Sequence, residues 1–333
     1  MKKWVLIISL VLFGCTEENE KLSTKDSHAT KVANNLNIPW SINLHGNTFY
    51  ISERVGTIAR IEDSTIVHEP VQLSDKLAAI SEAGLLGFVL KPNFGETGEA
   101  FAYYTYDING EHFNKVVTIK RDDGLWSETA VHLEDIATGN IHHGGRLEIG
   151  PDGALFVTVG DAGDPSNAQN PSSLNGKILR MKDDATFEIF SIGHRNPQGL
   201  AWDEDGTLYE AEHGQSANDE INMVEQGKNY GYPIIEGKET EDGLVSPIIT
   251  TGNAETWAPS GITFHKGKLY VATLRGESVK VIDVKTGKIE QSITGFGRVR
   301  DVFSDGASLY FITNNTDGRG TPSADDDILY KLE

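Results

Sequence analysis

Apolar residues in this chain occur in short alternating runs separated by turn-forming residues, and long helical periodicities are scarce. One pattern recurs six times: a turn containing glycine, a few β-branched or aromatic residues, and then polar residues. The copies read GNTFYISER from Gly46, GEAFAYYTY from Gly98, GALFVTVGD from Gly153, GTLYEAEHG from Gly206, GKLYVATLRG from Gly267 and GASLYFITNN from Gly306. Repeats of roughly 40 to 60 residues, with further strand-like runs between them, are typical of propeller blades. We therefore predict an all-β fold, a six-bladed β-propeller of four-stranded antiparallel blades.

The repeat also predicts where a site should lie. Equivalent positions in each blade lie at equivalent positions around the axis, so the polar residues after each repeated strand should gather at one end of the central channel. Loops on such a rigid scaffold commonly carry function. The residues concerned are Glu53, Arg54, Asp161, Glu212, His213, Arg275, Asn314 and Asn315.

The chain opens MKKWVLIISLVLFGC, two lysines and an apolar run too short to span a bilayer as a helix. The LFGC ending is similar to a bacterial lipobox, so we expect residues 1–15 to be a lipoprotein signal peptide and Cys15 to carry a lipid. A cleaved signal with a chance cysteine is the alternative. Residues 16–33 are polar and read as a flexible tether, and residues 34–333 as the propeller domain. These features predict an extracytoplasmic protein anchored to the cell membrane through its lipid.

Charge and cysteine content narrow the partners. The chain has 49 acidic and 29 basic residues, a formal net charge of −20. We therefore expect no nucleic-acid partner, because there is no basic excess to displace phosphate counterions. Cys15 is the one cysteine, which excludes intrachain disulfides and thiolate metal sites. The sequence contains no Rossmann fingerprint, P-loop or nucleophile elbow.

The stretch NIHHGGRLEIGPDGALFVTVGD, residues 140–161, places His142 and His143 against a glycine pair where a strand is expected. In an extended segment only one of the two rings can face a given site. The glycines leave space above the backbone, as a closely approaching ligand would need. Two polar loop residues beside a tight turn are the alternative interpretation.

A second stretch, SIGHRNPQGLAWDEDG, contains Arg195 and Asn196 before a proline. The planar guanidinium of Arg195 suits a carboxylate or a quinone oxygen. A structural arginine paired with Asp203 or Asp205 is equally compatible with the sequence.

Two further stretches carry charge. QSANDEINMVEQGKNYGYP contains Asp219 and Glu220, an oxygen-rich loop that could bind calcium or simply be a solvated acidic turn. In GFGRVRDV, Arg298 and Arg300 would point the same way from a strand, so they would repel unless an anion joins them. With Arg275 they could meet a ligand bearing several carboxylates; a solvated strand edge is the alternative.

These stretches, in this order, resemble the glucose/sorbosone dehydrogenase family, and most closely its soluble aldose sugar dehydrogenases. The likeness covers nearly all of the folded region and includes EAGLLGFVLKPNF, LNGKILRM, APSGITF and ATLRG. Members of this family are six-bladed propellers that use calcium and pyrroloquinoline quinone (PQQ). The resemblance implies oxidation of a small-molecule aldose to its lactone, with electrons passed on to a quinone or cytochrome. It leaves open a monomer or a homodimer.

The resemblance also implies roles for individual residues. The family's catalytic histidine precedes one residue and then Gly-Gly-Arg-Leu, which is His142 here, the base that would take the proton of the anomeric hydroxyl. Arg195 and Asn196 match the pair near the reactive carbonyls of the cofactor. Arg298 and Arg300 match the pair that binds its carboxylates.

Calcium ligands carry over in the same way. The backbone carbonyls of Gly214 and Gln215 match those that hold the calcium of the cofactor. Glu220 and the carbonyl of Tyr230 match a second calcium site. Calcium would act there as a Lewis acid on the quinone.

Two positions depart from the family pattern. Glu82 stands where a glutamine near the cofactor is expected, and its carboxylate would be unfavourable unless protonated or paired with a cation. Arg275 replaces a cofactor-binding lysine. Because of Glu82, the alternative function is a non-redox calcium-binding propeller lipoprotein that binds a carbohydrate or a protein. A lactone hydrolase is a third hypothesis, which would not need the Arg298 and Arg300 pair.

Overall fold

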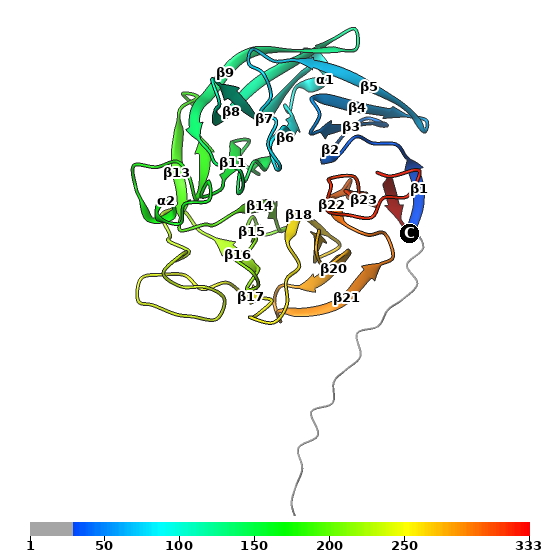
Figure 1. The fold of residues 1–333 in the computed structure, drawn as a ribbon. Helices are drawn as coiled ribbons and strands as arrows, with labels where there is room; N and C mark the ends of the chain where they lie inside the picture. Colours follow the sequence, from blue (N-terminus) through cyan, green and yellow to red (C-terminus); the bar gives the residue numbers. More distant parts are fainter. Residues whose placement is uncertain (1–28) are drawn as a thin grey trace, which may run out of the picture.

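The computed structural model describes residues 29–333, which form 24 β-strands and two helices of one turn each. The strands form six four-stranded antiparallel units around a central axis, as Figure 1 shows. The predicted six-bladed propeller is confirmed. We number the units blade 1 to blade 6 in chain order.

Within each blade the strands follow one another from the axis outwards. Their bounds, blade by blade, are β2 Pro39–His45, β3 Thr48–Glu53, β4 Thr57–Glu62 and β5 Thr65–Gln72; β6 Leu85–Leu90, β7 Glu99–Ile108, β8 Glu111–Asp122 and β9 Leu125–Ala137; β10 Leu147–Ile149, β11 Leu155–Val159, β12 Lys177–Met181 and β13 Phe187–Ile192; β14 Pro197–Trp202, β15 Leu208–Glu212, β16 Glu220–Val224 and β17 Ile249–Thr250; β18 Pro259–His265, β19 Lys268–Thr273, β20 Ser278–Asp283 and β21 Lys288–Thr294; β22 Val299–Ser304, β23 Leu309–Thr313, β24 Leu329–Leu332 and β1 Ala29–Ala33. The helices are α1, Phe94–Thr97, and α2, Ser166–Gln169.

The six repeated segments of the sequence are the second strands of the six blades, β3, β7, β11, β15, β19 and β23. These strands are covered by neighbouring blades, and β11 is buried along its whole length. Strands buried on both faces favour the unbroken β-branched and aromatic runs that the repeats contain. The repeat therefore marks the part of each blade that is most enclosed.

The ring is closed by pairing the two ends of the described chain. β1 runs antiparallel to β24, with Ala29 opposite Leu332, and Figure 1 shows the blue first strand beside the red last strands. The expected start of the domain at residue 34 is therefore too late, because Ala29–Ala33 already belongs to blade 6. ATKVA completes blade 6 because its alanine and valine positions pack against β24 and its neighbours.

The expected signal peptide, Cys15 and most of the tether lie outside the described residues. Among residues 29–333, no helix has the length and apolar character needed to cross a membrane.

Blades 1 and 2 are joined at their outer edges. β5 pairs with β9 in parallel, with Val71 opposite Trp126, so the two blades form one eight-stranded sheet. The indole of Trp126 is fully buried there and donates to Glu69 Oε2 over 2.9 Å. The pattern that recurs six times in the sequence did not predict this junction.

Candidate functional site

One end of the channel opens into a cavity of about 510 Å³. Loops from five of the six blades contribute its walls, and the lining residues are Glu82, His142, Arg195, Asn196, His213, Gly214, Gln215, Asp219, Thr256, Ala258, Leu274, Arg275, Glu277, Arg298 and Arg319. A smaller cavity of about 30 Å³ adjoins it, lined in part by Arg54, His143 and Arg300. In a chain of net charge −20, this concentration of guanidinium groups favours an anionic ligand.

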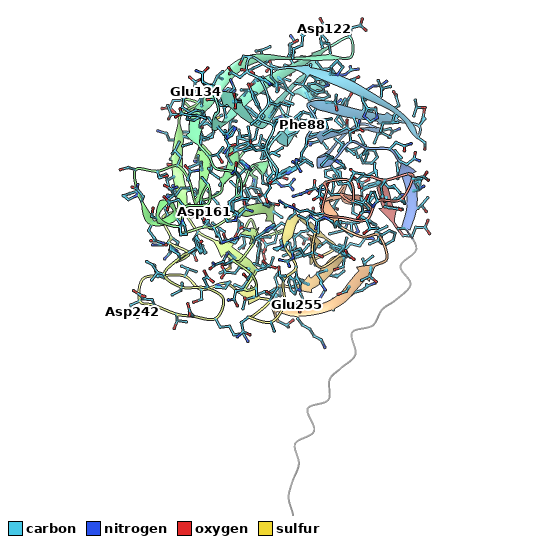
Figure 2. The ribbon with its side chains drawn as sticks, viewed as in Figure 1. Phe88, Asp122, Glu134, Asp161, Asp242 and Glu255 are labelled. Atoms are coloured by element: carbon cyan, nitrogen blue, oxygen red, sulfur yellow. The ribbon has the colours of Figure 1, made fainter. Side chains whose placement is uncertain are left out.

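His142 lies in the wall of the larger cavity and is oriented by Asp161. Its Nδ1 is 2.7 Å from Asp161 Oδ1, which also accepts from the Gly163 N–H over 2.7 Å. Asp161 directly follows the strand region of blade 3, is 1 % exposed and lies well inside the outline of the molecule in Figure 2. The contact fixes Nδ1 as the bonded nitrogen and leaves Nε2 available to a ligand.

The segment around His142 is not extended. His142 has φ 62°, a left-handed conformation that is uncommon for a residue with a side chain. His143 is turned inwards, with Nδ1 3.0 Å from Thr138 Oγ1, and burial lowers its pKa to about 4. The rings of His142 and His143 therefore have separate surroundings. This does not result from a strand, because β10 begins only at Leu147.

The glycine pair after the histidines serves packing and not ligand access. A Cβ on Gly144 would lie 2.6 Å from the Gly160 nitrogen and 2.8 Å from the Thr158 oxygen. A Cβ on Gly145 would approach Leu86 and Tyr103 within 3.2 Å. The expectation of open space for a ligand is wrong, because neighbouring backbone and side chains fill it.

Arg195 and Asn196 both lie at the cavity. Glu212 Oε2 accepts from the Arg195 backbone N–H over 2.6 Å, and Arg195 Nη1 donates to the His213 carbonyl over 3.1 Å. Asn196 Oδ1 accepts from the Gly144 N–H over 3.1 Å, which ties blade 4 to the histidine segment. The alternative in which Arg195 pairs with Asp203 or Asp205 is wrong.

Arg298, which directly precedes the inner strand β22, and Arg300, which lies within it, are held by different partners. Arg298 Nη2 forms an ion pair with Asp317 Oδ2 over 2.8 Å and Nη1 donates to the Leu274 carbonyl. Arg300 Nη1 donates to Gln198 Oε1 over 2.9 Å, and in its satisfied orientation the amide oxygen of Asn314 accepts from Arg300 Nε and Nη2.

Two buried guanidinium nitrogens of the arginines that line the larger cavity have no hydrogen-bond partner among the described residues. Among the described residues, nothing accepts a hydrogen bond from Nε of Arg195 or Nε of Arg298. Burial, reinforced by the charges of Arg54 and Arg298, lowers the pKa of Arg300 to about 9, although the carboxylate of Asp317 opposes the shift. A buried donor without an acceptor is costly, so these groups favour a ligand with acceptor oxygens.

Glu82 has the cation that its carboxylate requires. Arg319 Nη2 is 2.8 Å from Glu82 Oε1, and Glu82 Oε2 accepts from the backbone N–H of His142 over 3.1 Å. Burial alone would raise the pKa of Glu82, but the hydrogen bond and charge of Arg319 outweigh it and lower the pKa to about 2. The carboxylate is therefore ionised and paired.

The predicted gathering of polar residues is confirmed for most positions. Arg54, His213 and Arg275 line the two cavities. Four others hold those that do: Asp161, Glu212, Asn314 and Asn315. Glu53 instead bonds inside blade 1, where Oε2 lies 2.8 Å from His68 Nδ1. The polar residues that follow the repeated strands, with the exception of Glu53, therefore line the cavities or hold the residues that do.

Comparison with known proteins agrees with this geometry. The profile of the Glucose / Sorbosone dehydrogenase family matches residues 36–329. The chain belongs to this family. A structure of the PQQ-bound form of aldose sugar dehydrogenase from Streptomyces coelicolor superposes with a TM-score of 0.83 at 33% identity, covering 94% of this chain and 99% of that one.

Two curated relatives carry related names. The aldose sugar dehydrogenase YliI of Escherichia coli is 28% identical, over 85% of this chain and 89% of its own length. Quinoprotein glucose dehydrogenase B of Acinetobacter calcoaceticus is 29% identical, over 64% of this chain and 53% of its own length. The fold and the family are therefore those of sugar dehydrogenases of the quinoprotein type.

The residues expected to bind calcium are placed in two groups. Gly214 and Gln215 lie in the cavity wall, and among residues 29–333 no donor bonds to their carbonyl oxygens. Asp219 positions this loop, since its carboxylate accepts from the N–H groups of Gly214, Trp257 and Ala258. Free carbonyls beside anchored backbone suit a hard cation.

Glu220 and Tyr230 lie farther from the axis. Glu220 Oε1 accepts from the Gly237 N–H over 2.8 Å, and burial, with the charge of Glu212, raises its pKa to about 8. Tyr230 stacks on His194 with ring centroids 5.0 Å apart. Burial destabilises the ionised form of Glu220, and a bound cation would offset that cost. The sequence motif alone did not identify Glu212 and His194 as neighbours of Glu220 and Tyr230.

Sequence reasoning missed two functional residues, Arg319 and Asp317, and the role of a third, Asp161. Arg319 and Asp317 come from the loop between β23 and β24, where the sequence NNTDGRG reads as an ordinary turn. Asp161 was predicted to reach the site but not to orient His142. The sequence signal for Asp161 was the Gly-Asp pair that ends the third repeat.

Proposed function

We propose that this protein is a PQQ- and calcium-dependent aldose dehydrogenase that oxidises a sugar at its anomeric carbon to the lactone. The observation that carries the proposal is the juxtaposition of the His142–Asp161 pair with a cavity rich in arginine. Sugar hydroxyls explain the first feature and an anionic cofactor the second. Family membership supports both.

The arginines of the cavity would hold the cofactor. The unpartnered Nε groups of Arg195 and Arg298 are donors for its oxygens, with Asn196, Arg275 and Arg300 as further contacts. The carbonyls of Gly214 and Gln215 would hold calcium beside it. When bound, PQQ supplies a two-electron acceptor and calcium a Lewis acid.

His142 supplies the base. Because Asp161 bonds Nδ1, Nε2 carries the lone pair and can accept the proton of the anomeric hydroxyl. Asp161 also stabilises the imidazolium that forms, as a buried carboxylate does beside a catalytic histidine. The Glu82 contact to the His142 backbone keeps the ring in the cavity wall.

Glu82 was the feature that favoured a non-redox calcium-binding propeller. Its ion pair with Arg319 supports retention of the cofactor instead, because the pair presents no net charge to an anion.

We also propose that electrons pass to a quinone or cytochrome and that Cys15 carries a lipid that anchors the protein to the outer face of the cell membrane. Loss of radiolabelled fatty acid in Cys15→Ser would support the anchor, and retained label would contradict it.

Equilibrium binding of PQQ in excess calcium tests the proposed cofactor. We expect saturable binding by the wild-type protein and binding weaker by about tenfold or more in Arg298→Gln, because a charged hydrogen bond is removed. Arg180→Gln is the matched control, since Arg180 pairs with Asp152 on the surface of blade 3. No binding by the wild type, or equal binding by Arg298→Gln, would contradict the proposal.

A further inference from the structure

A cluster of buried acids lies between blades 3 and 4, apart from the cavity. Glu210 and Glu212 are two residues apart on β15, and register places them opposite Asn222 and Glu220 on β16. Side chains two residues apart on a strand share a face, and so do opposite residues of an antiparallel pair. All four side chains therefore meet on one face of blade 4.

This face is enclosed by blade 3. His194 lies against it, with Nδ1 3.3 Å from Glu212 Oε1, and Tyr230 stacks on the imidazole. Glu210, Asn222 and His194 are 0 % exposed. Glu210 and Glu212 are therefore shielded from solvent, whereas Glu220 at the edge of the cluster is partly exposed.

The charges of the cluster are not balanced by the protein. Among the described residues, no lysine or arginine forms an ion pair with Glu210, Glu212 or Glu220, and the ionisable partner that approaches them is His194, 3.3 Å from Glu212. The two buried carboxylates, Glu210 and Glu212, repel one another, and each needs a compensating cation or a proton. The nearest arginine, Arg195, reaches Glu212 through its backbone N–H alone.

Hydrogen bonding is incomplete as well. Asn222 Nδ2 lies 3.1 Å from Glu210 Oε2, 3.3 Å from Glu212 Oε1 and 3.5 Å from Glu220 Oε2, yet an amide has two hydrogens for these three acceptors. Within residues 29–333, Glu210 Oε1 and Asn222 Oδ1 have no partner. Buried acceptor oxygens are normally paired with a donor or a cation, so these two oxygens favour a ligand that is not part of the protein.

Ligand atoms of His194, Glu210 and Glu212 lie within 4.8 Å of one another, a spacing that one metal ion can bridge. His194 has the arrangement of a metal ligand: Nδ1 faces the carboxylates, and Nε2 lies 2.8 Å from Ser191 Oγ, which can accept a hydrogen bond from the Nε2–H. Rotation of the Asn222 amide would add Oδ1 as a further ligand.

We propose that His194, Glu210 and Glu212 bind a divalent first-row transition-metal ion, with Asn222 as an additional oxygen ligand. One imidazole and two carboxylates form a mixed nitrogen and oxygen set that suits Mn²⁺ or Zn²⁺ better than Ca²⁺, which prefers oxygen. The site differs in its ligands from the calcium positions expected at Gly214 and Gln215 and at Glu220 and Tyr230. Because Glu212 also accepts a hydrogen bond from the Arg195 backbone N–H, the metal would stabilise the loop that contains Arg195.

Metal content of the tag-free full chain tests this directly. The purified protein is stripped with chelator, saturated with CaCl₂, and offered MnCl₂ or ZnCl₂ before desalting and elemental analysis, with no PQQ present. We expect one equivalent of Mn²⁺ or Zn²⁺ per wild-type chain and a higher Tm when it is bound. Glu210→Gln, which keeps the shape of the side chain, should bind none and show no shift in Tm.

Glu204→Gln is the matched control, because Glu204 is an exposed carboxylate in the turn before β15, and it should behave as the wild type. No metal in the wild type with Tm unmoved, or full metal content in Glu210→Gln, would overturn the proposal. If Glu210→Gln does not fold, pulsed EPR of Mn²⁺ on the wild type decides. Coupling to an imidazole nitrogen supports the site, and its absence contradicts it.

Discussion

Glu82 and Arg319, which are 237 residues apart in sequence, form an ion pair of 2.8 Å at the wall of the central cavity. The pair joins the segment before β6 in blade 2 to the loop that precedes β24 in blade 6. The second carboxylate oxygen of Glu82 holds the backbone of His142. A charge that would repel an anionic cofactor is thus neutralised, and the same carboxylate positions the proposed base.

Arg319→Gln tests the importance of this pair. The change leaves the Glu82 carboxylate without its cation beside the cavity, so we expect PQQ to bind about tenfold more weakly through like-charge repulsion. Glu82→Gln/Arg319→Gln should recover most of the loss, because the neutral pair carries no charge. Equilibrium titration with PQQ in excess calcium measures both effects.

The pH dependence of binding separates this role from a structural one. In Arg319→Gln the pKa of Glu82 should rise, since burial favours the neutral acid and the arginine no longer opposes it. Binding by this variant should therefore improve as pH falls from 7 to 5. The wild type, with the Glu82 pKa at about 2, should show no such gain. Equal pH profiles for both proteins would argue against the pair.

Asp161→Asn tests the orientation of His142. An amide can present its oxygen or its NH₂ to Nδ1 but supplies no charge to the imidazolium, so we expect kcat lower by about 100-fold to 10,000-fold. PQQ affinity should change little. His142→Ala should abolish turnover while the cofactor still binds. Wild-type kcat in His142→Ala would show that another group takes the proton, and wild-type kcat in Asp161→Asn would show that His142 does not need the Asp161 carboxylate.

Much of this architecture could be predicted from sequence because it is periodic. Each repeat contains a turn, a buried strand and the polar residue at its end, so Asp161 and His213 could be assigned to one end of the channel before any coordinates. Local patterns of this kind reflect steric and burial requirements within a few residues.

Contacts between distant segments could not be predicted in this way. The partner of Glu82 is a half-exposed arginine in a turn of blade 6, and nothing in the sequence around Arg319 identifies Glu82 as its partner. The closing strand at Ala29–Ala33 was assigned to the tether because five residues of mixed polarity acquire a strand pattern only beside β24. The role of Gly144 likewise depends on the backbone of β11.

His143 should make the protein sensitive to acid. Burial lowers its folded-state pKa to about 4, below the usual value of 6.5, so the unfolded chain binds the proton first. Stability should therefore fall as pH drops from 6.5 to 4, by up to about 1.4 kcal/mol per pH unit for this one group. In His143→Asn the slope of unfolding free energy against pH should be smaller over this range. An unchanged slope in urea denaturation would contradict the assignment.

We propose that this propeller oxidises aldoses with PQQ and calcium at the His142 site. Dye-linked activity measures it: the purified protein is mixed with an aldose and an artificial electron acceptor, with PQQ and calcium added separately and together, and with His142→Ala in parallel. We predict dye reduction that needs the sugar and both additions and is absent in His142→Ala. Saturable PQQ binding without sugar-dependent dye reduction, across a panel of aldoses, would contradict it.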